Sequence, residues 1–245
     1  MVPVFWSALE NYSNIRLKGK KSLVPLTEPE LEHLLNFIGY GSLDAPVWFL
    51  GMEEAGGGEA NLRARLKFHE VEDCAEAHRL LGITKHHEGK RVIQRTWRGM
   101  CYLMLKMDGK ATDAESIRAY QAESLGRFGG QTLLVELMPI PKAGIGAWGY
   151  EELIPQYASR EDYYRKVKPR RLVYLRGLLR DHPPRMVVGY GKGYWPEYRA
   201  LFGTVDFVTQ GQFQVGRQAG LMVVLTDHFT SRTMNGKLDE VVAIF

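Results

Sequence analysis

The sequence predicts an α/β protein with a mostly parallel sheet and helices on both faces. Short apolar runs recur at residues 46–51, 132–137, 185–190 and 221–226. Each run is continuous rather than alternating, which is typical of a strand buried on both faces. Segments of helical periodicity separate the runs, and strands that alternate with helices indicate a parallel sheet.

The first expected helix begins after Thr27. Thr27 and Glu30 form a capping box, with Pro29 in the first turn. Leucines follow at helical spacing, and we expect the helix to end near Gly39 or Gly41. We expect residues 1–245 to form a single domain, in which residues 1–45 are a helical N-terminal lead-in.

The remaining elements follow the same logic. Apolar stripes or capping residues predict helices over 90–107, 112–125, 159–179 and 193–201. Pro169 is expected to bend or divide the third of these. Residues 205–208 are expected to form a fifth strand at the edge of the sheet.

Composition excludes several classes of protein. The chain has 245 residues, of which 45% are hydrophobic and 24% are charged, so it is globular rather than disordered or fibrous. No stretch approaches the roughly 18 consecutive apolar residues of a membrane span, and the N-terminus lacks the features of a secretory signal. The two cysteines cannot form a disulfide framework or bind an iron–sulfur cluster. We therefore expect a cytoplasmic protein with no membrane partner. A net charge of +4 permits a polyanionic partner without requiring one.

Polar residues gather at the ends of the predicted strands, where open parallel sheets bind ligands. Glu53 and Glu54 follow the first strand in a glycine-rich segment. Two carboxylates repel phosphate but suit a general base or a hydrogen-bond acceptor. The alternative interpretation is a flexible turn in which both acids are solvated. Glu136 ends the second strand, where a buried carboxylate needs a structural ion pair or a ligand.

The other two strand ends carry glycines, aromatics and a histidine. Lys192 lies in a Gly-Tyr-Gly-Lys-Gly segment that suits an anionic or stacking ligand, or simply a tight turn. His228 follows the fourth strand and can act as an acid, a base or a donor to a developing anion.

We predict no metal and no cofactor. His69, Cys74 and His78 lie on a probable helix, but with Cys101 they match no standard zinc spacing. The two neighbouring histidines, His86 and His87, are expected in a solvated loop.

The order of the four strand-end motifs resembles the uracil-DNA glycosylase superfamily. The first strand and Gly51-Met52-Glu53-Glu54 are similar to its first motif. Glu136 occupies the position of its base-reading Asn, and residues 187–191 resemble its third strand. Residues 228–232 resemble its final His-Pro-Ser motif and the residue that follows. The resemblance covers about residues 45–235.

That resemblance implies a three-layer α/β/α sandwich around a four-stranded sheet, and excision of a base from DNA. Glu53 and His228 would be catalytic, and Gly51, Met52 and Glu136 would bind the base. Lys142, Lys192 and Arg232 would contact DNA, whereas the Arg-rich segment 165–180 is better explained as a solvated helix face. As a carboxylate, Glu136 would favour a base that bears an amino group. The alternative is a non-catalytic module that binds a nucleobase, a nucleotide or DNA.

Overall fold

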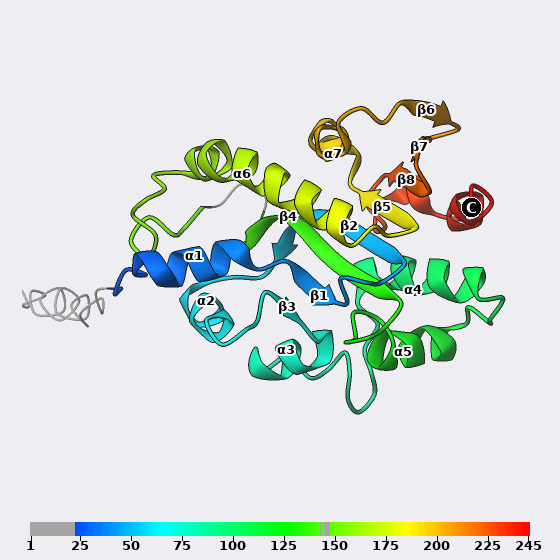
Figure 1. Cartoon of the computed structure of the whole chain (residues 1–245). Helices are drawn as coiled ribbons and strands as arrows, with labels where there is room; N and C mark the ends of the chain where they lie inside the picture. Colours follow the sequence, from blue (N-terminus) through cyan, green and yellow to red (C-terminus); the bar gives the residue numbers. More distant parts are fainter. Residues whose placement is uncertain (1–22, 143, 145–147) are drawn as a thin grey trace, which may run out of the picture.

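The computed structural model describes residues 23–142, 144 and 148–245, and within them it forms an α/β fold around one sheet (Figure 1). The sheet has eight strands in the order β3-β1-β4-β2-β5-β8-β7-β6. They are β1 (Gly39–Gly41), β2 (Val47–Ala55), β3 (Val71–Glu72), β4 (Thr132–Lys142), β5 (Met186–Tyr190), β6 (Phe207–Gln210), β7 (Phe213–Gln218) and β8 (Leu221–Thr226).

Strands β4, β2, β5 and β8 are parallel neighbours at the centre of the sheet. They are the four strands that the sequence predicts, so the α/β class and this parallel core are confirmed. The expected total of four strands is wrong, because β1 and β3 extend the sheet beyond β4, and β7 and β6 extend it beyond β8. β1 joins β4, and β7 joins β8, in antiparallel pairs. Residues 207–210 confirm the expected edge strand.

Gly39 and Gly41, expected to end the first helix, belong instead to strand β1. Helix α1 (Glu28–Asn36) ends earlier than expected, and Gly39 to Gly41 then pair with β4. A Cβ atom on Gly39 would lie 1.9 Å from the carbonyl oxygen of Leu134. Glycine is needed there for a close approach of two strands.

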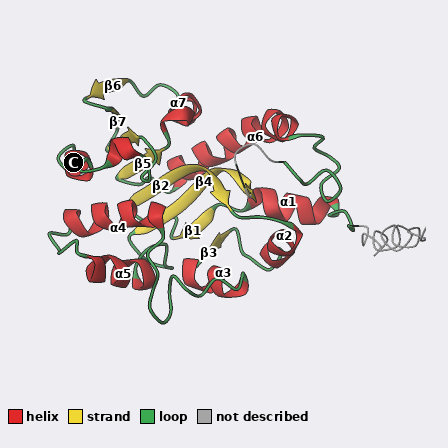
Figure 2. Ribbon diagram, turned by 180° about the vertical axis from the view of Figure 1, so that it is seen from behind, coloured by secondary structure: helices red, strands yellow, loops and turns green. Residues whose placement is uncertain are grey.

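Helices cover both faces of the sheet, as Figure 2 shows from behind. Buried side chains of α1, α6 (Arg160–Asp181) and α7 (Trp195–Phe202) pack with Trp48 and Leu50 of β2. Those of α3 (Cys74–Leu80), α4 (Arg95–Met107), α5 (Ala114–Glu123) and α8 (Leu238–Val242) pack with Val47 and Phe49 on the other face. Helix α2 (Glu59–Arg65) and 3-10 turns at Lys192–Tyr194 and Arg232–Met234 complete the elements. The alternation along β2 confirms a strand buried on both faces.

Of the two outcomes expected at Pro169, a division of the helix does not occur, because α6 runs unbroken from Arg160 to Asp181. The carbonyl that loses its helical partner belongs to Arg165, and both residues lie on the exposed side, where water can replace the bond. Buried side chains on the other side hold the helix continuous through Tyr163, Val167 and Leu175.

Two predicted segments fall partly outside the described residues: the first 22 residues of the lead-in, and positions 143 and 145–147 after β4. Among the helices of the described chain, none combines the length and apolar character needed to cross a bilayer.

Candidate functional site

The four predicted strand ends meet at one edge of the sheet. Because β4, β2, β5 and β8 are parallel neighbours, their carboxyl ends place Glu136, Gly51, Tyr190 and Thr226 along this edge. We call it the carboxyl edge. His228 lies two residues beyond Thr226, after Asp227.

Glu136 is held in a tight polar contact. The Tyr190 hydroxyl donates to Oε1 at 2.8 Å, whereas Oε2 is buried without a hydrogen-bond partner. A Cβ atom on Gly51 would lie 2.1 Å from Oε2 and 2.4 Å from the Tyr190 hydroxyl, so only glycine leaves room for this pair. Gly51 is therefore required beside Glu136, whatever it binds.

The pKa of Glu136 is raised to about 8, chiefly by burial; the Tyr190 hydrogen bond opposes this shift, and the nearby carboxylates of Glu54 and Glu53 add to it. At neutral pH the side chain is therefore mostly a neutral acid. A protonated carboxyl group can donate one hydrogen bond and accept others, as an amide does. The sequence alone predicts a carboxylate that only accepts hydrogen bonds, whereas the buried side chain can also donate one.

Glu136 lines a cavity of about 180 Å³ whose walls include several aromatic rings. We call it the Glu136 pocket. Its lining includes Phe37, Tyr40, Glu54, His78, His86, Trp97, Glu136 and Tyr190. Flat aromatic walls and one acid group that both donates and accepts suit a planar, polar ligand.

Glu54 is fixed at the side of this pocket. The Tyr40 hydroxyl donates to its two oxygens at 3.1 and 2.9 Å, and Arg65 donates at 2.7 Å. Arg65 is only 4% exposed. Because its charge is paired inside the fold, Glu54 serves to hold Tyr40 and Arg65 in the wall.

Glu53 turns to a different set of partners. Its Oε2 accepts from the Tyr164 hydroxyl at 2.9 Å and from Arg160 at 3.2 Å, and Lys142 lies 3.4 Å away. The predicted catalytic carboxylate is thus balanced by two cations. Lys142, predicted to contact DNA, is 4% exposed and faces Glu53, which favours a role in holding that carboxylate over a contact to phosphate.

His228 has a defined hydrogen-bonding state. The backbone N–H of Thr230 donates to its Nδ1 at 3.3 Å, and the Thr230 hydroxyl lies 2.8 Å from the same atom. Burial lowers the pKa of His228, although Asp227 opposes the shift. A neutral ring that accepts at Nδ1 carries its proton on Nε2. His228 therefore offers an N–H donor from Nε2.

His228 and Glu53 line one cavity of about 190 Å³ together with Met52, Lys142, Tyr190 and Tyr194. We call it the His228 pocket. It shares Glu54 and Tyr190 with the Glu136 pocket. The structure thus brings Glu53 and His228 to one cavity and Glu136 to its neighbour, with Tyr190 between them.

The other predicted residues differ in exposure. Met52 is buried in the core cluster and reaches the His228 pocket. Lys192 and Arg232 are exposed, and the Lys192 ammonium lies 5.6 Å from the Trp195 ring centroid.

Sequence reasoning missed several residues of the pocket walls. Tyr40, Arg65 and Trp97 reach the site from outside the four predicted strands, and no motif marks them. The expected solvated loop at His86 and His87 is wrong, since both side chains are 9% exposed. They pack around Trp97, with ring centroids 5.6 and 5.7 Å away.

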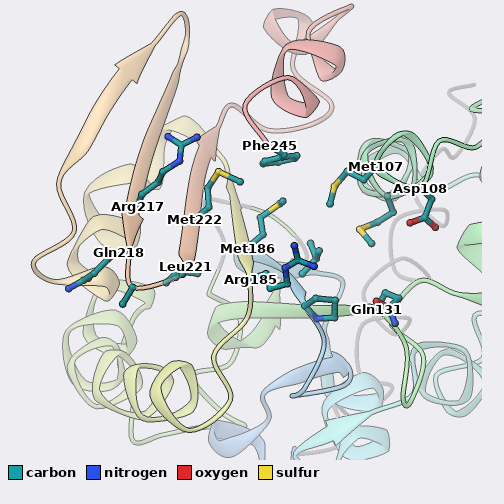
Figure 3. A pocket seen from close by; sticks show the side chains of 15 residues that line it. Met107, Asp108, Gln131, Arg185, Met186, Arg217, Gln218, Leu221, Met222 and Phe245 are labelled. Carbon is teal, nitrogen blue, oxygen red and sulfur yellow. The ribbon is translucent and has the colours of Figure 1, made fainter.

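A larger cavity, of about 730 Å³, lies at the amino ends of β2, β5 and β8, on the opposite edge of the sheet. Figure 3 shows Met107, Met186, Met222 and Phe245 around it, with Arg185 and Arg217 nearby. It contains none of the predicted site residues. The buried acid and the histidine donor lie at the carboxyl edge, so that edge is the better candidate for chemistry.

No protein-family model matches the chain, and no curated protein matches it. The resemblance to the uracil-DNA glycosylase superfamily therefore stays a prediction that rests on the strand-end motifs.

Proposed function

We propose that this protein binds a nucleobase at the carboxyl edge of its sheet and hydrolyses the N-glycosidic bond that joins the base to DNA. The main support is the neutral acid Glu136, held by Tyr190 in an aromatic pocket that adjoins the pocket of His228. The resemblance of the strand-end motifs to those of the uracil-DNA glycosylase superfamily, with its α/β/α architecture, supports the same reaction.

In this proposal, the target base leaves the stack and enters the Glu136 pocket. When the glycosidic bond breaks, its electron pair goes to the base, and water supplies hydroxide to the sugar carbon and a proton to the departing base. The Nε2–H of His228 donates to the negative charge that develops on the base. Glu53, which lines the same pocket as His228, would favour the cationic sugar electrostatically.

A neutral Glu136 selects a base edge with one donor beside one acceptor. Its carbonyl oxygen accepts from an N–H group, and its hydroxyl donates to a neighbouring oxygen or nitrogen. An imide edge, as in uracil, meets this requirement, so an amino-bearing base is no longer favoured over it.

The proposed partner of the protein is DNA. The proposed location is the cytoplasm, a reducing compartment. Lys192 and Arg232 are exposed just after β5 and β8, where they can meet phosphates. Cys74 and Cys101 are free thiols, which supports the cytoplasm.

A specific observation favours a second candidate, a non-catalytic module that binds a nucleobase or nucleotide. Glu53 is paired with Lys142 and Arg160, and this reduces its ability to activate water. Glu53 does not line the Glu136 pocket, so a base could bind there even if Glu53 activates no water and no reaction follows.

A strand-nicking assay separates the two candidates. Duplexes that carry a panel of damaged or mispaired bases are incubated with the protein, treated with alkali and scored for cleavage. We expect cleavage at one or more bases with an imide-type edge, and Glu136→Gln should keep the same preference at pH 7, because an amide resembles the neutral acid. Base binding by calorimetry without cleavage on any duplex would support the second candidate instead.

A further inference from the structure

A cluster of metal-ligating side chains lies behind the wall of the Glu136 pocket. Cys74 Sγ and one ring nitrogen each of His78 and His87 all lie within 4.8 Å of one another. Cys74 begins α3 and His78 follows one turn later on the same side of the helix. His87 comes from the loop between α3 and α4. None of these side chains is used in the proposed reaction.

The two histidines already stand near the spacing that a bound metal requires. The distance between His78 Nδ1 and His87 Nε2 is 3.0 Å. In a tetrahedral zinc site with Zn–N bonds of about 2.0–2.1 Å, two ligand nitrogens are about 3.3 Å apart, and a nitrogen and a thiolate sulfur about 3.6 Å apart. The nitrogens would need to separate by only a few tenths of an ångström.

Nδ1 of His78 and Nε2 of His87 share one hydrogen-bond proton, so on metal binding the donating ring would move this proton to its other nitrogen and both facing lone pairs would turn to the ion. Nδ1 of His87 is buried without a hydrogen-bond partner. A metal at Nε2 would keep the proton of this ring on Nδ1.

We propose that Cys74, His78 and His87 form a site for a divalent metal ion of the zinc class. A thiolate with two imidazoles is a soft to borderline set of ligands, which suits Zn²⁺ and not Mg²⁺ or Ca²⁺. On binding, the metal–sulfur bond replaces the S–H bond of Cys74, and the proton leaves to solvent. Three protein ligands leave one position for water.

The ion would link His87, in the loop after α3, to Cys74 and His78 on that helix, and would restrict the motion of this side of the Glu136 pocket. His78 lines the Glu136 pocket and stacks on Trp97, with centroids 5.0 Å apart and an interplanar angle of 18°. This proposal departs from the expectation from sequence that no metal binds. Three residues separate Cys74 from His78, and eight separate His78 from His87. This spacing matches no standard zinc motif, so the site cannot be found from the sequence and depends on how the loop packs against α3.

The test is a titration of the full chain with Co²⁺, which reports both thiolate ligation and tetrahedral geometry in its absorption spectrum. We expect one Co²⁺ per chain, a thiolate-to-cobalt charge-transfer band, and loss of the spectrum when Zn²⁺ is added. Cys74→Ser should abolish the charge-transfer band. His87→Gln should weaken binding by about 100-fold or more, above the 10–100-fold effect of changes outside the ligand set.

Cys101→Ser and His69→Gln are the matched controls. Cys101 is the other buried thiol, and the His69 side chain is 84% exposed. Both should keep the cobalt spectrum of wild type. The proposal is overturned if wild-type protein gives no thiolate band, if the band persists in Cys74→Ser, or if Cys101→Ser removes it while remaining folded by circular dichroism.

Thermal unfolding provides a second readout that does not depend on the colour of cobalt. Zn²⁺ should raise the melting temperature of wild type and of Cys101→Ser, because an ion that binds only the folded state stabilises it. An equal rise in Cys74→Ser would place the ion elsewhere and contradict the proposal.

Discussion

Glu136 shows how much a single residue depends on its surroundings. Its carboxyl group would ionise near pH 4.5 in an open chain, but burial between Gly51 and Tyr190 raises its pKa to about 8. Between these two values the unfolded chain releases the proton and the folded chain keeps it. Stability that is fully present below pH 4.5 is therefore lost as the pH rises toward 8.

Glu136→Gln should remove this dependence. We expect the unfolding free energy of wild type, measured relative to Glu136→Gln, to fall by a few kcal/mol between about pH 5 and pH 9, at about 1.4 kcal/mol for each unit of pKa difference. Urea titrations at several pH values measure it. Exposed Glu152→Gln is the control and should follow wild type. A difference between wild type and Glu136→Gln that does not vary with pH would mean that Glu136 is not held protonated.

His228→Ala should slow the chemical step far more than it weakens binding. Charge builds on the leaving base only in the transition state, so the Nε2–H donor stabilises that state more than the bound substrate. Loss of one such donor costs on the order of 100-fold or more in rate.

Single-turnover kinetics on the best substrate of the panel measure this effect. The control is His182→Ala, since His182 lies at the end of α6 and contacts Asp44 at 2.8 Å. An unchanged rate in His228→Ala would remove His228 from catalysis and leave the binding module as the better candidate.

At the scale of elements, one buried cation joins α6 to the sheet. Arg171 is 2% exposed and donates to the carbonyl oxygens of Phe37 at 2.7 Å, Glu136 at 3.2 Å and Leu137 at 3.3 Å. It therefore ties α6 both to β4 and to the end of α1.

Arg171→Met should destabilise the fold by about 2–4 kcal/mol, because it leaves buried carbonyl groups without donors. Urea unfolding measures the change. The neighbouring Arg170 makes an exposed ion pair with Glu32, so Arg170→Met should cost at most about 1 kcal/mol. Equal effects of the two substitutions would refute a special role for Arg171.

For the whole molecule, the charge predicts how DNA is bound. A net charge of +4 allows a local basic patch only, so affinity for duplex should be weak and mostly independent of sequence, with a dissociation constant of roughly 10⁻⁴–10⁻⁶ M. Fluorescence anisotropy over a series of salt concentrations tests this.

Replacing both Lys192 and Arg232 by Gln should lower the slope of log affinity against log salt by about 2, at about 0.9 for each lost phosphate contact. Arg180→Gln, at the far end of α6, should leave the slope unchanged. Affinity that does not fall as salt rises would contradict a DNA partner of this kind.

Local sequence pattern is enough to predict the parallel core and the edge where the candidate site lies. Continuous apolar runs and capping boxes act over a few residues, so β2, β4, β5, β8 and most helices follow from local pattern. Strands β1 and β3 did not, because they are short and exist through pairing with β4 and with each other.

The protonation and pairing of the site residues depend on the folded chain. It gave Glu53 two cations, kept Glu136 neutral, set the proton of His228 on Nε2, and brought His87 to Cys74 and His78. Burial and the identity of neighbours distant in sequence fix protonation and pairing, and neither is encoded in local pattern.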